Sequence, residues 1–236
     1  MIISFCFTIK IINSIDNLER YQTMISKAVN CAKEHHKVNF YTDAETLPYL
    51  DIEGVDIKLI DTNGFYFVDD FKIHLLSIIS DEEVLVDTDL FLFKELKLED
   101  AKDVYVDFMD SSKQKWYTEY LNWFIDNGIN ELIPEFGNDI ITVPNIGILK
   151  IQNTQLKEEY REMYYKIREW VLYKDTTITK GVSIILGQYL LGLLVQKYKV
   201  GYCYSSNNHY VHLSGPSKFK LNILNNIQPN KIKKLL

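Results

Sequence analysis

The apolar residues follow two different periods in the N-terminal part of the chain. Residues 2–9 are rich in Ile, Phe and Thr, which is typical of a buried β-strand. From Leu18 to about His35, apolar side chains recur at helical spacing and predict a helix. Residues 38–42, Val-Asn-Phe-Tyr-Thr, predict a second strand. The chain therefore opens with a β-α-β unit.

The alternation of strand and helix continues toward the C-terminus. Further strands are predicted at residues 55–60, 83–86, 104–107, 143–151 and 200–204, with 104–107 at an edge of the sheet. Helices are predicted at residues 69–80, 113–127, 154–173 and 179–198. The helix at 113–127 carries an aromatic stripe, which favours packing in the core. This order predicts an α/β fold with a mixed, mainly parallel central sheet flanked by helices.

Composition limits the number of domains and the kinds of partner. The chain has 236 residues, 47% of them hydrophobic, so it can bury one substantial core and a single domain is expected. Its formal net charge of -6 excludes a chain-wide basic surface for nucleic acid. The three cysteines are widely separated and odd in number, which argues against a disulfide framework or structural zinc site. We therefore expect a reducing, cytoplasmic location.

The apolar segments do not predict a membrane span. The N-terminal run lacks the basic region and cleavage site of a secretory signal. Residues 182–195 form the most apolar stretch, which is too short to cross a bilayer and predicts a core helix. The tail at 221–236 ends in a short basic and apolar sequence that allows only weak peripheral contact with an anionic membrane.

An acidic pair, Asp87-Thr88-Asp89, follows the predicted strand at residues 83–86. Ligands of α/β sheets bind outside the carboxyl ends of the strands, so both carboxylates are expected at a binding crevice. Two carboxylates at this spacing can hold a hard divalent cation beside the oxygens of a diphosphate. Taken alone, such a pair is also typical of an exposed turn.

A second polar group lies near the C-terminus, where His212, Gly215 and Lys218 follow one another at three-residue intervals. Imidazole can complete a manganese-type site, and lysine provides a point charge suited to phosphate. A single histidine or lysine in a loop is more often an ordinary surface residue. The order of this group and the acidic pair along the chain decides between the two interpretations.

Three motifs in this order resemble those of a known family. They are the apolar strand running into Asp87-Thr88-Asp89, the Asn-x-Gly segment at Asn145 and Gly147, and the His-x-x-Gly-x-x-Lys segment from His212 to Lys218. The chain thus resembles the retaining GT-A glycosyltransferases, which include glycogenin and bacterial lipopolysaccharide galactosyl- and glucosyltransferases. The resemblance implies a single Rossmann-like GT-A domain over 1–236, with a nucleotide-binding half at 1–110 and an acceptor and donor-sugar half at 111–220.

The resemblance also implies an activity. The expected reaction is transfer of a hexose from a nucleotide sugar, a UDP-sugar in the simplest case, with retention of anomeric configuration. The acceptor, whether glycan, lipid or protein, and the oligomeric state are not indicated. Asp87, Asp89 and His212 would bind Mn²⁺ or Mg²⁺, and Lys218 would contact the diphosphate. The candidate catalytic residues are Asp89, Gln188 and Lys218, and the further candidate contacts to the nucleotide sugar are Thr8, Tyr41, Thr42, Asp43, Lys72, Asp87, Thr88, Asn145, Gly147 and Gly215.

The chain departs from the family pattern at three places. Lys72 stands where the family often has an arginine, and lysine cannot make the same bidentate contact. Gly187 precedes Gln188 where the family carries an acid. Phe219 follows Lys218 where the family continues with proline and tryptophan. The metal site is therefore better defined by the sequence than the phosphate contacts.

Two other functions use some of the same residues. A phosphohydrolase of the haloacid dehalogenase type also places Asp-x-Asp after a strand, with the first acid as nucleophile. Its motif normally lies near the start of the core and continues with Thr or Val where this chain has Phe91. A non-catalytic nucleotide-sugar-binding protein is the second alternative.

Overall fold

The main sheet crosses the centre of the protein. The computed structural model describes residues 1–11, 18–98, 101–112, 115–137, 141–174, 185–203 and 210–213. Within these residues the sheet has seven strands in the order β3-β2-β1-β4-β7-β6-β8. The strands are β1 (Ile2–Cys6), β2 (Lys37–Thr42), β3 (Asp56–Leu59), β4 (Glu83–Val86), β6 (Val104–Ser111), β7 (Thr142–Ile151) and β8 (Val200–Tyr202). A second, two-stranded sheet joins β5 (Leu90–Leu92) to β9 (Tyr210–His212).

Parallel pairing dominates the main sheet. β1 runs parallel to β2 and β4, β2 to β3, and β6 to β8. Only β7 runs antiparallel to its two neighbours, β4 and β6. The predicted α/β fold with a mixed, mainly parallel sheet is confirmed. The expectation that residues 104–107 form an edge strand is wrong, because β8 pairs with the outer side of β6.

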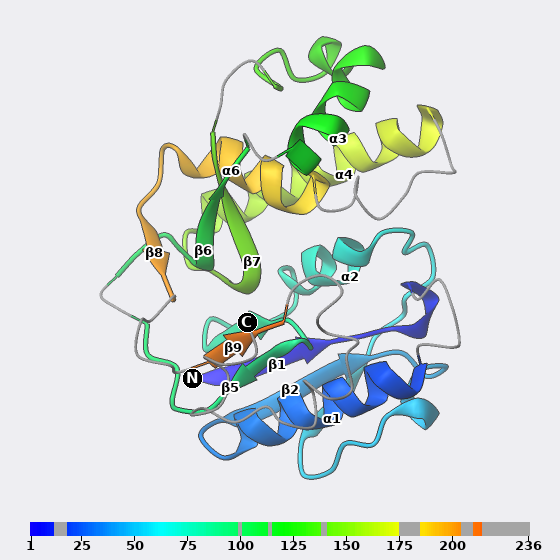
Figure 1. Cartoon of the computed structure of the whole chain (residues 1–236), viewed down its shortest axis with the longest axis vertical. Coiled ribbons are helices and arrows are strands. Elements are labelled where there is room, and N and C mark those ends of the chain that lie inside the picture. Colours follow the sequence, from blue (N-terminus) through cyan, green and yellow to red (C-terminus); the bar gives the residue numbers. More distant parts are fainter. Residues whose placement is uncertain are drawn as a thin grey trace.

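Helices cover both faces of the sheet. The α-helices are α1 (Leu18–Lys33), α2 (Val68–Leu75), α3 (Lys115–Asp126), α4 (Thr154–Lys174) and α6 (Leu190–Val195). Shorter helical turns are η1 (Ile9–Ile11), η3 (Leu47–Tyr49), η4 (Ile129–Glu131) and the π-helix η5 (Ile185–Tyr189). In Figure 1, α1 lies against β1 and β2, whereas α3, α4 and α6 gather around β6 and β7. In the described part of the chain, no helix is both long and apolar enough to cross a membrane.

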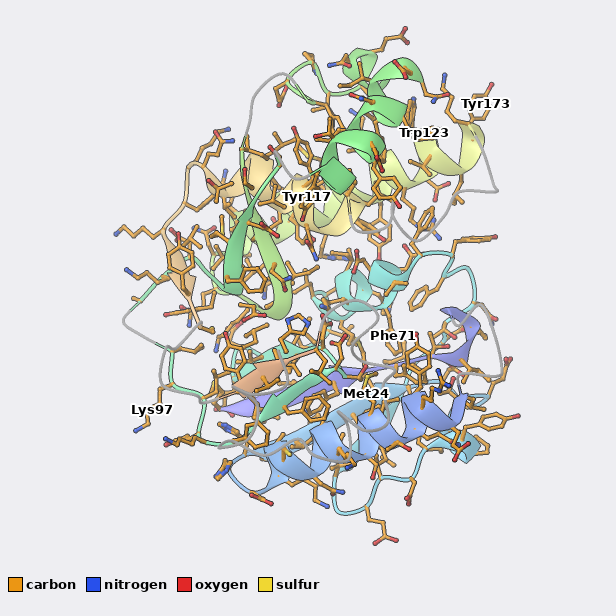
Figure 2. The ribbon with its side chains drawn as sticks, viewed as in Figure 1. Met24, Phe71, Lys97, Tyr117, Trp123 and Tyr173 are labelled. Carbon is orange, nitrogen blue, oxygen red and sulfur yellow. The ribbon has the colours of Figure 1, made fainter. Side chains whose placement is uncertain are left out.

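Side chains from opposite faces of the central strands pack into two separate cores. On β4, Val84 and Val86 pack with α1, while Leu85 packs on the opposite face with α2, α4 and α6. Met24 of α1 and Phe71 of α2 are each 1% exposed and belong to these opposite cores (Figure 2). The sheet is therefore the middle layer of an α/β/α arrangement.

Three aromatic residues of α3, Tyr117, Trp123 and Phe124, pack into or against the core. Tyr117 and Phe124 are fully buried. The ring of Trp123 (Figure 2) lies 5.2 Å from that of Phe124 and 6.1 Å from that of Trp170 on α4, centroid to centroid. Edge-to-face pairs at these distances stabilise a core beyond the apolar area they bury. The expectation of core packing for this stripe is confirmed for these residues.

The predicted helix at 179–198 differs from the structure in its first part. Residues 185–189 form the π-helix η5, and a regular α-helix, α6, begins only at Leu190. The hydroxyl of Tyr160 on α4 donates to the carbonyl of Gly187 at 2.7 Å, which satisfies a carbonyl in the widened turn. π-Helical turns often occur at functional sites. Residues 179–184 lie outside the described part of the chain.

A buried ion pair fixes helix α2 to helix α4. The Asp70 carboxylate accepts hydrogen bonds from the backbone N–H groups of Tyr66 and Phe67, and so caps the start of α2. The same carboxylate accepts bonds from Tyr164 at 2.8 Å and from Nε of Arg168 at 2.9 Å. Asp70 is 1% exposed, so it has a structural role.

Candidate metal centre

The acidic pair occupies the turn that leads from β4 of the main sheet into β5 of the small sheet. The backbone N–H of Asp87 donates to the carbonyl of Gly147 on β7 at 2.8 Å, and the N–H of Leu90 returns to the carbonyl of Asp87 at 3.1 Å. Asp89 is 7% exposed, whereas Asp87 and Thr88 are half-buried. The pair therefore lies at the carboxyl end of a central strand, where the sequence predicted a binding crevice.

His212 reaches the acidic pair through the small sheet. β9 runs antiparallel to β5, with His212 opposite Leu90. The N–H of Leu213 donates to the carbonyl of Asp89 at 2.9 Å, which extends the pairing to the acid itself. His212 Nε2 lies 3.3 Å from Asp89 Oδ1. One ligand atom from each of Asp87, Asp89 and His212 can be chosen so that all three lie within 4.8 Å of one another.

Asp107 on β6 orients the imidazole of His212 and was not identified from the sequence. Its Oδ2 lies 2.7 Å from His212 Nδ1, and because a carboxylate can only accept, Nδ1–H donates. Its Oδ1 accepts from the hydroxyl of Tyr210. Asp107 is fully buried at an irregularity in the pairing of β6 with β7. The signal in the sequence was an acid directly after three apolar residues of a strand, because a buried charge at such a position requires a partner.

The electrostatics of the site hold His212 in its charged form. Burial alone would lower the pKa of the imidazole, but Asp107 and Asp89 outweigh burial and raise it to about 10. The two carboxylates thus oppose the effect of burial on the pKa of the imidazole. A cation placed among Asp87, Asp89 and Nε2 of His212 would balance the negative charge of the carboxylates in place of the proton on the imidazole.

Gly147 makes room for His212. A Cβ at this position would lie 2.5 Å from Cε1 and 2.8 Å from Nδ1 of His212. Because glycine has no side chain, the imidazole can approach the backbone closely at this position. Oδ1 of Asn145 accepts a hydrogen bond from the N–H of Gly147 at 2.9 Å, so both residues of the Asn-x-Gly segment shape the wall beside the metal ligands.

Lys72 on α2 also contacts the acidic pair of the candidate metal centre. Its Nζ lies 2.6 Å from Oδ1 of Asp87 and donates to the carbonyl of Ile146 at 2.7 Å. Burial acts to lower the pKa of this amine, but Asp87 and Asp69 outweigh burial and raise it. The positive charge is therefore fixed beside the acidic pair, where the sequence expected a contact to phosphate.

The predicted nucleotide contacts lie at the ends of β1 and β2. Thr8, Thr42 and Asp43 are buried there, and the Asp43 carboxylate accepts from the backbone N–H and the hydroxyl of Thr46, each at 2.9 Å. The hydroxyl of Thr42 donates to the carbonyl of Phe7 at 2.9 Å. Tyr41 points toward the opposite end of the sheet, where its hydroxyl donates to Glu83 at 2.7 Å. Nucleotide binding by these residues stays a prediction.

The remaining candidate site residues are Gln188, Gly215 and Lys218. Gln188 lies in η5, where its Oε1 accepts from the hydroxyl of Tyr117 at 2.6 Å. Gly215 and Lys218 lie outside the described residues. The structure thus brings together Asp87, Asp89, His212, Lys72, Asn145 and Gly147.

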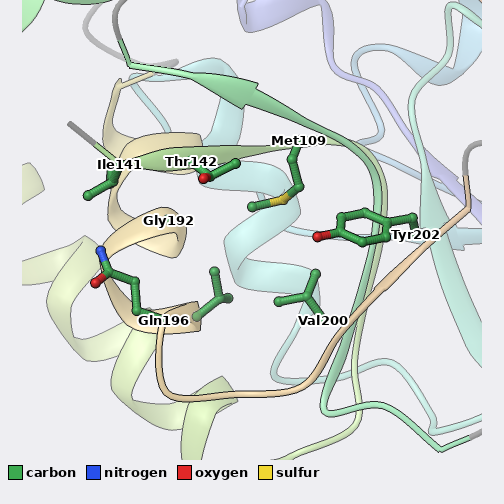
Figure 3. Close-up of a pocket in the computed structure, with 8 residues that line it drawn as sticks. Met109, Ile141, Thr142, Gly192, Gln196, Val200 and Tyr202 are labelled. Atoms are coloured by element: carbon green, nitrogen blue, oxygen red, sulfur yellow. The ribbon is translucent and has the colours of Figure 1, made fainter.

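A pocket of about 540 Å³ is lined by residues from β6, β7, α6 and β8 (Figure 3). Met109 of β6, Gly192 of α6 and Val200 of β8 contribute to its walls, and Thr142, Gln196 and Tyr202 supply polar groups. None of Asp87, Asp89 and His212 belongs to this lining. The pocket is therefore separate from the metal ligands.

Comparison with solved structures identifies glycosyltransferases among similar proteins. The chain is similar to the glycosyltransferase GlyE of Streptococcus pneumoniae TIGR4, at 14% identity and a TM-score of 0.44, over 85% of this chain and 44% of GlyE. It is also similar to mouse xyloside xylosyltransferase 1 in its apo form, at 10% identity and a TM-score of 0.42, over 83% of this chain and 81% of that chain. This chain thus spans less than half of GlyE. No protein-family model and no curated protein sequence matches it.

Proposed function

We propose that this protein is a metal-dependent glycosyltransferase that transfers a hexose from a nucleotide sugar, with a UDP-sugar as donor and with retention of anomeric configuration. The observation that carries the proposal is the convergence of Asp87, Asp89 and His212, whose ligand atoms lie within 4.8 Å of one another. His212 is remote in sequence from the acidic pair, and pairing of β5 with β9 brings it to Asp87 and Asp89.

The donor set suits a divalent cation of the manganese or magnesium type. Carboxylate oxygens are the preferred ligands of hard cations, and an imidazole nitrogen favours manganese over magnesium. Asp107 bonds to Nδ1 of His212 and so directs Nε2 toward the carboxylates. A bound cation at this position would stabilise the charge that develops on a leaving diphosphate.

The protein's own residues supply binding and charge around that position. Lys72 is fixed 2.6 Å from Asp87 and is proposed to place its positive charge next to the diphosphate. Asn145 and Gly147 form the adjoining wall, and Gln188 stands in the π-helical turn that faces α2. Lys218 is proposed as a second diphosphate contact from the His-x-x-Gly-x-x-Lys segment. Fixed positive groups of this kind stabilise negative charge without reorganisation during the reaction.

The phosphohydrolase alternative leaves part of the site unexplained. It assigns roles to Asp87 and Asp89 but none to the imidazole held between Asp89 and Asp107. The glycosyltransferase proposal uses all of these groups. It is therefore the function that the geometry supports best.

The test is to incubate the protein with a panel of UDP- and GDP-sugars and Mn²⁺ and to measure the released nucleotide. We expect turnover of at least one UDP-sugar, reduced roughly 100-fold or more in Asp89→Ala and strongly in His212→Ala. The exposed residues Asp51 and His35 provide matched controls, because Asp51→Ala and His35→Ala remove the same groups away from the site.

Three outcomes would contradict the proposal. Equal turnover in the presence of a chelator would exclude a role for the metal. Hydrolysis of generic phosphate esters without response to nucleotide sugars would favour a phosphohydrolase. Metal-dependent binding of a nucleotide sugar without any release of nucleotide over long incubation would favour a non-catalytic binding protein.

A further inference from the structure

The two neighbouring acids at the start of α2 point in different directions. Asp70 is buried in its ion pair with Arg168 and fixes the helix. Asp69 is half-buried, and its carboxylate faces Gly187 of η5. A Cβ added to Gly187 would lie 2.8 Å from Cγ of Asp69 and closer still to Oδ2. The carboxylate of Asp69 therefore occupies the space in which residue 187 would otherwise place a side chain.

Asp69 lies beside residues already assigned to the proposed active site. Lys72 follows it by one turn of α2, and helical residues at this spacing lie on the same face. Nζ of Lys72 lies 2.6 Å from Oδ1 of Asp87. Gln188 adjoins Gly187 in the chain and is bonded to Tyr117. Asp69 is thus next to both the cation-binding side and the π-helical turn.

We propose that Asp69, together with Gln188, forms the subsite for the transferred hexose, with the Asp69 carboxylate accepting hydrogen bonds from two neighbouring sugar hydroxyls. This inference rests on the proposed function and adds a specificity-determining residue to it. A carboxylate offers two acceptor oxygens, which match a pair of adjacent hydroxyl donors. Charge-assisted hydrogen bonds of this kind are stronger than neutral ones, and partial burial strengthens them further.

The chain also provides a reason for glycine at position 187. Any larger residue there would displace the carboxylate of Asp69, since the contact distances leave no room for a Cβ. The backbone conformation of Gly187 is not one that requires glycine, because it is absent from the residues with positive φ. Space for Asp69, rather than the turn itself, accounts for the missing side chain.

The experiment compares the full chain and Asp69→Asn in binding two ligands by calorimetry in the presence of Mn²⁺. The ligands are UDP and the UDP-sugar that gives most turnover. We expect Asp69→Asn to weaken binding of the UDP-sugar roughly 10- to 100-fold, and binding of UDP by less than about two-fold. Asp51→Asn removes an exposed carboxylate and serves as the control. Circular dichroism and thermal unfolding establish that each variant is folded.

A second variant displaces the carboxylate without changing its chemistry. Gly187→Ala adds the Cβ that collides with Asp69, so it should reproduce the selective loss of UDP-sugar binding. The double variant Asp69→Asn, Gly187→Ala should lose little more than either single variant, because both act on the same contact.

The outcomes separate this inference from the proposed function. If the full chain binds neither UDP nor any UDP-sugar, the proposed function fails. If the full chain binds both but Asp69→Asn weakens the two ligands equally, Asp69 acts through the diphosphate and Lys72, and the hexose subsite is wrong. Unchanged binding in Asp69→Asn, or fully multiplicative losses in the double variant, would also overturn it.

Discussion

His212 can offer only one ring nitrogen to a ligand, because Asp107 holds the other. Nδ1 lies 2.7 Å from the Asp107 carboxylate, and Nε2 faces Asp89 at 3.3 Å. Loss of a partner that orients a ligating histidine commonly lowers metal affinity about 10- to 100-fold. At the scale of single residues, the buried acid on β6 is therefore part of the site.

Replacing Asp107 tests this role. Asp107→Asn keeps the shape of the side chain but removes the charge that orients the imidazole, so Mn²⁺ affinity should fall about 10- to 100-fold. Titration calorimetry with Mn²⁺ measures the change. Tyr210→Phe removes the other hydrogen bond to Asp107 and should have a smaller effect. Unchanged Mn²⁺ affinity in Asp107→Asn would show that His212 needs no such support.

At the scale of elements, the small sheet decides whether the ligands meet. β5 follows the acidic pair directly, and β9 carries His212, so their pairing sets the distance between the two motifs. The last hydrogen bond of this pairing runs from the N–H of Leu213 to the carbonyl of Asp89. Loss of that bond should detach the end of β9 beside the site.

The pair of variants Leu213→Pro and Leu213→Ala separates this bond from the apolar packing of the side chain. Leu213 is 2% exposed, so both variants lose buried apolar contacts at a cost of roughly 2–5 kcal/mol. Only proline also lacks the N–H that bonds to Asp89. We expect Mn²⁺ binding to be retained in folded Leu213→Ala and lost in Leu213→Pro. Equal Mn²⁺ affinity in the two variants would contradict a role for the pairing.

At the scale of the whole molecule, a buried carboxylate joins three strands at the end of the sheet opposite the metal centre. Glu83 begins β4 and accepts hydrogen bonds from Ser4 on β1 and from Asn39 and Tyr41 on β2. Burial alone would raise the pKa of Glu83, but these bonds and those from Ser80 outweigh burial and lower it to about 2. The charged form is thus favoured in the folded protein.

Acid unfolding should reveal this contribution. Because the pKa of Glu83 is about 2 in the folded protein and 4.5 in its ordinary state, its stabilising effect is complete above pH 4.5 and is lost as the pH falls toward 2. We expect Glu83→Gln to lower the free energy of unfolding at pH 7 by about 3 kcal/mol and to flatten its pH dependence below 4.5. Urea unfolding from pH 7 to pH 2 measures both effects. Parallel pH profiles for the two proteins would show that ionisation of Glu83 does not contribute to the free energy of unfolding.

The main elements of the fold could be predicted because their signals are local. Apolar periodicity gave the strands around Val84 and Ile148 and the helices that cover them. The predictions were wrong where longer-range pairing decides the outcome. β6 became an inner strand through β8, and the start of the last helix became a π-helix against Tyr160. β5 and β9 are too short for periodicity to identify.

By itself, the sequence determined the α/β class, the position of Asp87 and Asp89 at a strand end, and the order of the motifs, because each depends on neighbouring residues along the chain. Only the tertiary structure decided that His212 and Asp107 meet this pair and that Asp69 fills the space over Gly187. These contacts join side chains from separate strands and helices. Their distances are set by strand pairing and core packing, which no local pattern of residues records.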